Sequence, residues 1–75
     1  MNDARRKLIA QAIQQLQDAL NNVEQTQGDE QDAYDNMPEN MQSGEKGEVM
    51  SGAIDALDSA KGSIEEALDY LQVIE

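Results

Sequence analysis

The sequence predicts an all-α protein, an antiparallel two-helix hairpin of the coiled-coil type. Along two long stretches, apolar residues recur in alternating steps of four and three, which is the spacing of a coiled-coil seam. Between these stretches, residues 37–44 hold the only proline of the chain. We therefore expect residues 1–75 to form a single hairpin, with a helix at about 3–36, a turn at about 37–44 and a second helix at about 45–74.

The first helix is expected to begin at Asn2 or Asp3, whose short side-chain oxygens can accept the free amide protons of a first turn. Gln27 and Glu30 are polar residues at seam positions and lie on either side of Gly28. The helix is expected to be looser there but continuous, because the register is kept. The seam consists of Ile9, Ile13, Leu16, Leu20, Val23, Gln27, Glu30, Tyr34 and Met37.

Pro38 marks the bend. A proline disfavours the α conformation of the residue before it and has no amide proton of its own, so the first helix is expected to end near Asn36. Residues 38–41 are expected to form one helical turn with Asn36 as its cap. The second helix then starts at Ser43 or Gly44.

The second helix repeats the pattern, and its seam matches that of the first. Folding the chain about residue 42 brings apolar pairs such as Leu16 and Leu68 to the same level. The same fold places the basic segment 5–7 beside Glu75 and the carbonyl end of the second helix, a favourable pairing. The seam residues are Met50, Ile54, Leu57, Lys61, Ile64, Leu68 and Leu71.

A line of alanines beside each seam predicts a homodimer. These alanines occupy the g positions of the heptads, so the apolar face is wider than a two-stranded seam requires. This width is typical of a four-helix bundle built from two hairpins. The alternative is that alanine serves only as a good surface helix former. The predicted oligomer interface consists of Ala12, Ala19, Ala53, Ala60, Ala67, Leu57 and Ile64.

The charge is the strongest compositional feature. Sixteen acidic and five basic residues give a net charge of −11, and the chain from Leu8 onward carries −13. Such a body repels nucleic acid and anionic membranes and attracts basic surfaces. No apolar run is long enough to span a bilayer. We expect a cytoplasmic protein that binds neither nucleic acid nor membrane directly.

The sequence predicts no enzyme, no cofactor and no metal centre. The chain has no histidine and no cysteine, which removes the usual zinc ligands and the usual nucleophile–base pairs. Paired carboxylates would need a concave, partly desolvated site that two helices do not build. The acidic segment 29–35 lacks the glycine and the ligand spacing of a calcium loop. Weak divalent binding at the bend is left as an open alternative.

The charge density suggests nucleic-acid mimicry. Two helices of about thirty residues make a rod of roughly 45 Å. A net charge of −13 over that length is about one charge per 3.5 Å, close to the spacing along one DNA strand. Ordinary solubility is the competing explanation of the same charge.

The bend also carries a resemblance. Residues 35–42 read DNMPENMQ and residues 44–48 read GEKGE. This segment resembles the turn of small acidic helical-hairpin proteins of bacteriophages and prophages, in which two heptad helices flank a similar motif. The resemblance covers nearly the whole chain. It implies a phage setting, in a group largely without assigned function.

Two functions from different classes follow. The first is a non-catalytic, phage-type protein that binds and inhibits a host nucleic-acid-handling or defence protein with a basic surface. The second is a structural hairpin for oligomerisation or assembly, whose acidity only keeps it soluble. Sequestration of a small ligand ranks last, because the sequence offers no basic pocket. The predicted partner-binding residues are Asp32, Asp35, Glu39, Glu45, Glu48, Asp55, Asp58 and Tyr70.

Overall fold

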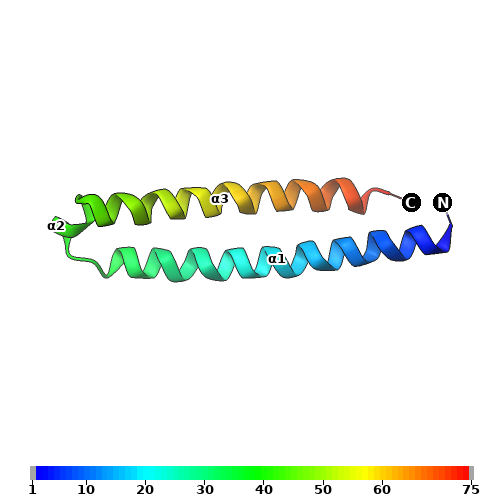
Figure 1. Cartoon of the computed structure of the whole chain (residues 1–75), viewed down its shortest axis with the longest axis horizontal. Coiled ribbons are helices and arrows are strands. Elements are labelled where there is room, and N and C mark those ends of the chain that lie inside the picture. Colours follow the sequence, from blue (N-terminus) through cyan, green and yellow to red (C-terminus); the bar gives the residue numbers. More distant parts are fainter. Residues whose placement is uncertain (1, 75) are drawn as a thin grey trace.

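The computed structural model describes residues 2–74 and confirms an all-α hairpin. Helix α1 (Asp3–Asp35) and helix α3 (Glu45–Gln72) lie side by side and antiparallel, joined by the short helix α2 (Glu39–Gln42). The described residues contain no β-strand. Figure 1 shows α2 at one end of the molecule and both termini at the other. The predicted pairing with Glu75 lies outside the described residues.

Helix α1 starts at the predicted cap and is unbroken. The Asn2 side-chain oxygen accepts the backbone N–H of Arg5 at 2.9 Å, so Asn2 is the N-cap. The helix continues through Gly28 to Asp35, as the preserved register predicts. A methyl group built on Gly28 would meet nothing within 4 Å, so this glycine serves no close contact between described atoms.

The expected capping role of Asn36 is wrong. Asn36 is instead the C-cap of α1, and its backbone N–H donates to the carbonyls of Asp32 and Tyr34. Its backbone stays in the helical region and cannot open a new helix. Pro38 takes the N-cap position of α2, without a side-chain hydrogen bond. Gly44 is the N-cap of α3, which was one of the two expected starts.

Gln42 ties the bend to the end of α1. Its side-chain Nε2 donates to the carbonyl oxygens of Tyr34 at 2.9 Å and Met37 at 3.1 Å. Tyr34 belongs to the last turn of α1, and Met37 lies two residues beyond the end of that helix. One amide group thereby binds two backbone acceptors and holds α2 against the end of α1.

Gly47 lets the first turn of α3 pack closely against the backbone of Gln42. A Cβ atom built on Gly47 would lie 2.0 Å from the carbonyl oxygen of Gln42 and 2.6 Å from its Cα. Gly47 is one of two buried residues of α3. Only a residue without a side chain fits this contact, so Gln42 and Gly47 together set the geometry of the bend.

The seam forms as predicted but leaves the hairpin without a deep core. All nine predicted seam residues of α1 and six of the seven in α3 are half-buried. Leu68 is the exception: at 7% exposure it is the only buried apolar residue of the described chain. Two helices therefore shield one side of each seam residue and leave the flank of the seam in water.

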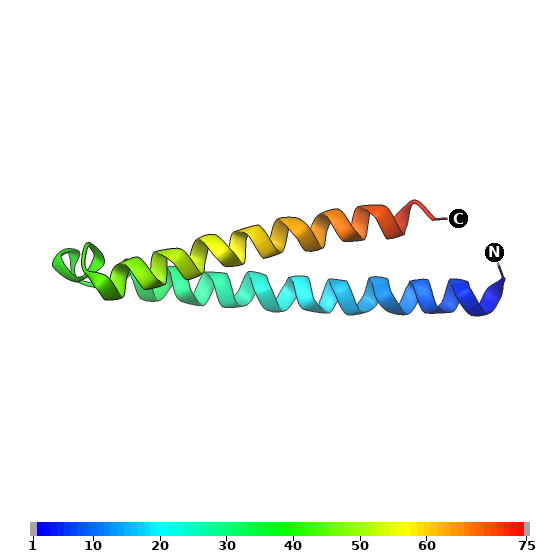
Figure 2. The ribbon, with the colours of Figure 1, turned by 45° about the horizontal axis from the view of Figure 1, so that its top comes forward.

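The molecule is a rod. Its extents are 58 × 15 × 13 Å and its radius of gyration is 17.1 Å, against roughly 11 Å for a compact domain of this length. In the view of Figure 2, the axes of α1 and α3 cross at a shallow angle, so the helices overlap near the bend and separate toward the termini. None of the described helices is long and apolar enough to cross a membrane.

Candidate functional site

The negative charge is concentrated on one half of the rod. Residues 24–60, which form the half that contains the bend, hold ten acidic residues and one lysine, for a net charge of −9. We call this part the bend half. The remaining residues form the terminal half, which holds six acidic and four basic residues, for a net charge of −2. The two ends of the rod therefore differ strongly in potential.

The acidic side chains point into water. Of the fifteen acidic residues between 2 and 74, fourteen are exposed, and only Glu30 is half-buried. Exposed side chains of this kind are free to meet a basic surface. The bend half is thus a strongly anionic surface.

Seven of the eight predicted partner-binding residues lie in the bend half. Asp32 and Asp35 end α1, Glu39 opens α2, and Glu45 and Glu48 open α3. Asp55 and Asp58 follow farther along α3, still in the bend half. Tyr70 lies apart from them, on the terminal half. All eight are exposed.

A second face of the rod is almost free of charge. The residues at heptad positions g and c repeat in the same steps of four and three as the seam, on its flank. Of these sixteen positions only Asp29 is charged, although 28% of the chain is charged. We call this surface the alanine-rich face. It consists of Leu8, Ala12, Gln15, Ala19, Asn22, Thr26, Asp29 and Ala33 from α1, and Val49, Ala53, Ala56, Ala60, Ser63, Ala67, Tyr70 and Ile74 from the α3 side.

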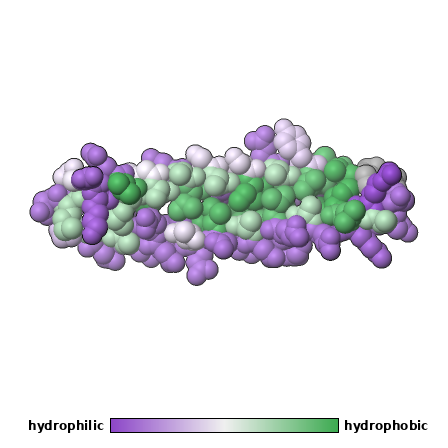
Figure 3. Space-filling model, in the orientation of Figure 1, coloured by the Kyte–Doolittle hydropathy of each residue, from purple (hydrophilic) through white to green (hydrophobic). Residues whose placement is uncertain are grey.

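The alanine-rich face is the one seen in Figure 3. In Figure 1, α1 runs from right to left and α3 from left to right. Right-handed helices running in these directions turn their g positions toward the viewer and their e positions away. In the same orientation, Figure 3 shows an apolar band along the molecule, bordered by polar atoms along its lower edge and at both ends.

The predicted oligomer-interface residues lie on or beside this face. Ala19 is exposed. The other six, which are Ala12, Ala53, Leu57, Ala60, Ile64 and Ala67, are half-buried. Several large apolar side chains of the same face are more exposed, with Leu8 at 62%, Val49 and Tyr70 at 68% and Ile74 at 44%. The hairpin alone does not cover them.

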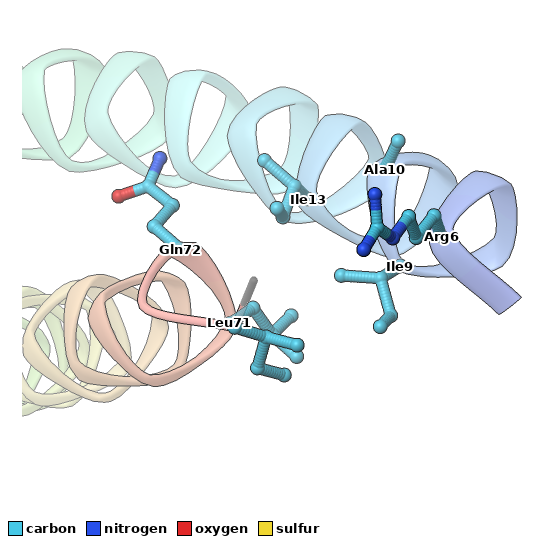
Figure 4. Close-up of a pocket in the computed structure, with 7 residues that line it drawn as sticks. Arg6, Ile9, Ala10, Ile13, Leu71 and Gln72 are labelled. Carbon is cyan, nitrogen blue, oxygen red and sulfur yellow. The ribbon is translucent and has the colours of Figure 1, made fainter. Parts of the chain in front are cut away.

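The open end of the hairpin holds an apolar hollow of about 350 Å³. Ile9 and Ile13 of α1 and Leu71 of α3 lie along it between the two helices (Figure 4). Arg6 is the one charged side chain among its described lining residues. The other described lining residues are apolar or neutral. These residues come from the end of the seam near the termini, where folding about residue 42 brings apolar residues of the two helices to the same level.

A second hollow, of about 300 Å³, lies near the middle of the rod, on the polar flank of the seam opposite the alanine-rich face. Lys61, at a seam position of α3, lines it together with Glu24 and Gln27 of α1. Beside it, Gln27 Nε2 donates to Asp58 Oδ1 at 3.3 Å and links the two long helices. These contacts complete the polar stretch of the seam around Gly28.

Neither the described side chains nor the comparisons indicate a known chemistry. Among residues 2–74, no group of three or more acidic residues is arranged to hold a metal ion. No protein-family model, curated protein or solved structure matches this chain. The phage-type resemblance of the bend therefore remains a prediction from the sequence.

Two features escaped the sequence reasoning. The contact between Gly47 and Gln42 joins a bend glycine to a backbone five residues away, and no periodic pattern signals it. The apolar c positions were detectable, because Leu8, Val49 and Tyr70 lie beside the alanines at regular heptad spacing. An apolar face defined by the a, d and g positions alone does not include them.

Proposed function

We propose that this protein is a non-catalytic, phage-type interaction protein that binds and inhibits a host nucleic-acid-handling or defence protein. In this proposal the bend half of the rod enters a basic cleft of the partner. The four-helix bundle formed by two hairpins is the acting form. The observation that carries the proposal is the separation of charge, with −9 on the bend half and −2 on the terminal half.

The charge density of the bend half supports nucleic-acid mimicry. Averaged over the 58 Å rod, the net charge of −11 is only about one charge per 5 Å, less than the sequence suggested. Over half that length, however, −9 amounts to about one charge per 3 Å, near the 3.4 Å spacing of a DNA strand. A surface that recognises phosphates by their charge would find a similar field here.

Capture from a bacterial lysate tests the proposal. The full chain, immobilised at its C-terminus so that the bend is free, should retain basic nucleic-acid-binding proteins, and double-stranded DNA should displace them. Neutralising Asp32, Asp35, Glu39 and Asp55 to their amides should weaken capture about tenfold or more, because complementary charge drives the encounter. Retention would be quantified by mass spectrometry.

The matched control neutralises the same number of acids on the terminal half, namely Asp18, Glu65, Glu66 and Asp69. This control variant should capture the same proteins with little loss. Equal loss in both variants would show that net charge alone matters and that the bend half is no specific site. Captured proteins that DNA does not displace would contradict mimicry.

The second candidate function is an assembly hairpin, which the alanine-rich face favours. An exposed apolar band of this kind is typical of a surface that other helices cover. Under this function the acidity serves solubility only, and the bend variant would behave like the wild-type protein in every capture experiment.

A further inference from the structure

The hairpin exposes more surface than a self-sufficient domain. Its accessible surface is 5529 Å², whereas a compact monomer of 8.3 kDa exposes roughly 4,600 Å². The excess of about 900 Å² matches the roughly 800 Å² that each partner buries in a stable interface. The alanine-rich face is the surface that can supply this area, because it is nearly uncharged and carries the exposed Leu8, Val49 and Tyr70.

The size of the face requires that two copies overlap along their whole length. A face of 58 by 15 Å has a footprint of about 870 Å², which meets the requirement of a standard interface. Overlap of the terminal halves alone would halve that area and fall below the range of stable complexes. End-to-end contact is therefore too small.

Charge then selects the orientation. A two-fold axis along the rod would place the two bend halves together, with −9 beside −9. A two-fold axis across the rod places each bend half, at −9, beside the terminal half of the other copy, at −2. That terminal half carries Arg5, Arg6 and Lys7, which come to lie near the carboxylates of the other bend. Coulomb repulsion is lower in the second arrangement at every separation.

We infer that the alanine-rich face binds a second copy of this chain in the antiparallel orientation, with the two acidic bends at opposite ends of a four-helix rod. This inference rests on the proposed function, whose acting form is a dimer, and identifies its surface and geometry. Each helix faces its own copy across the interface. Tyr70 and Ile74 of one copy lie toward the small residues Ala53 and Ala56 of the other, so large side chains meet small ones.

The arrangement has a functional consequence. The tips of the two bends lie at opposite ends of the dimer, about one rod length apart, so one dimer presents an acidic bend to a basic partner at each end. A dimer can then hold two partner molecules, or two basic regions of one assembly, and gain avidity when both bind at once. A parallel dimer would fuse both bends into one site.

A pair of neighbouring substitutions tests the face. Ala60 lies on the alanine-rich face and Ser59 lies on the outer surface beside it. Ala60→Glu should shift the dimer to monomer in sedimentation equilibrium, by at least about tenfold in dissociation constant, because it buries an unpaired charge. Ser59→Glu adds the same charge in water and should leave the dimer intact. A monomeric wild-type protein at 100 μM, or equal effects of both variants, would overturn the inference.

Spin-label distances test the orientation. The chain has no cysteine, so Asn40→Cys at the bend and Asn21→Cys near mid-rod each give one label per copy. In the antiparallel dimer the Asn40→Cys labels should be separated by nearly the 58 Å length of the rod. The Asn21→Cys labels should lie about 20–30 Å apart, across two layers of helices.

The other outcomes are distinct. If the Asn40→Cys labels lie as close together as the Asn21→Cys labels, the dimer is parallel. If the labels of both variants lie far apart, the copies meet end to end. Either result overturns the inference. Neither outcome bears on capture by the acidic bend, which is read from the neutralised variants. Loss of specific capture with an antiparallel dimer intact would instead overturn the proposed function alone.

Discussion

Replacing Gly47 with alanine is expected to lower the free energy of unfolding by at least about 2 kcal/mol, the largest effect of any single methyl group in this chain. The new Cβ would lie 2.0 Å from the carbonyl oxygen of Gln42. The obstacle is backbone, so no side-chain rotation relieves it, and α3 must move away from the bend. The melting temperature at a fixed protein concentration, followed by circular dichroism, should fall by roughly 10 °C or more.

Gly62→Ala is the matched control. Gly62 also lies inside α3, but a methyl group there meets nothing within 4 Å. Alanine is the better helix former by about 1 kcal/mol, so this variant should be more stable than the wild type. If Gly47→Ala were as stable as Gly62→Ala, the close contact at the bend would not exist in solution.

Replacing Gln42 is expected to produce the second-largest effect on stability. Gln42→Ala removes the hydrogen bonds to the carbonyls of Tyr34 and Met37 and should cost about 1–3 kcal/mol. Gln42→Glu keeps the size of the side chain but turns its donor into a carboxylate oxygen that faces the carbonyls of Tyr34 and Met37. The near-isosteric variant should therefore be less stable than the alanine variant.

Gln31 provides the comparison for this order. Its Nε2 donates to Asp35 in an exposed, intrahelical hydrogen bond, and such surface pairs contribute only a few tenths of a kcal/mol. Gln31→Ala and Gln31→Glu should both stay within about 0.5 kcal/mol of the wild type in urea unfolding. Equal stability of Gln42→Glu and Gln42→Ala would show that the side chain fills space and does not bind the carbonyls.

The sequence was sufficient for the hairpin because its information is periodic. The four–three spacing from Ile9 to Met37 identified the face that becomes half-buried, and the shared centre near residue 42 set the pairing of the two helices. Proline chemistry located the end of α1 to within one residue. These are local rules that act along a single helix, and a helix obeys them with little help from tertiary contacts.

The details of the bend could not be derived in this way. The cap predicted at Asn36 was wrong because its amide closes α1, a choice that depends on two carbonyls already fixed by that helix. The Gly47 contact is a tertiary one between backbones, for which glycine in a turn has many competing explanations. The candidate site could be predicted in part. The acidic residues are visible in the sequence, but the net charges of −9 on the bend half and −2 on the terminal half follow only once the chain is folded into the hairpin.

The two proposals assign opposite physical characters to two surfaces of the rod. In the proposed dimer, the alanine-rich face joins copies by apolar burial, against the mutual repulsion of two chains that each carry −11. In the proposed function, the bend half attracts a basic partner by charge. Salt screens both the repulsion and the attraction, because the screening length falls to about 10 Å at 0.1 M and is shorter at higher concentrations. Salt should therefore strengthen the dimer and weaken the partner complex.

The most direct test measures both dissociation constants from 0.05 to 0.5 M sodium chloride. Sedimentation equilibrium would report the dimer, and titration of the most abundant captured basic protein would report the partner complex. We expect the dimer to become tighter with salt and the partner complex to weaken at least about tenfold over this range. A partner affinity that stays constant while the dimer responds, or a dimer that dissociates as salt rises, would contradict the division of roles between the two surfaces.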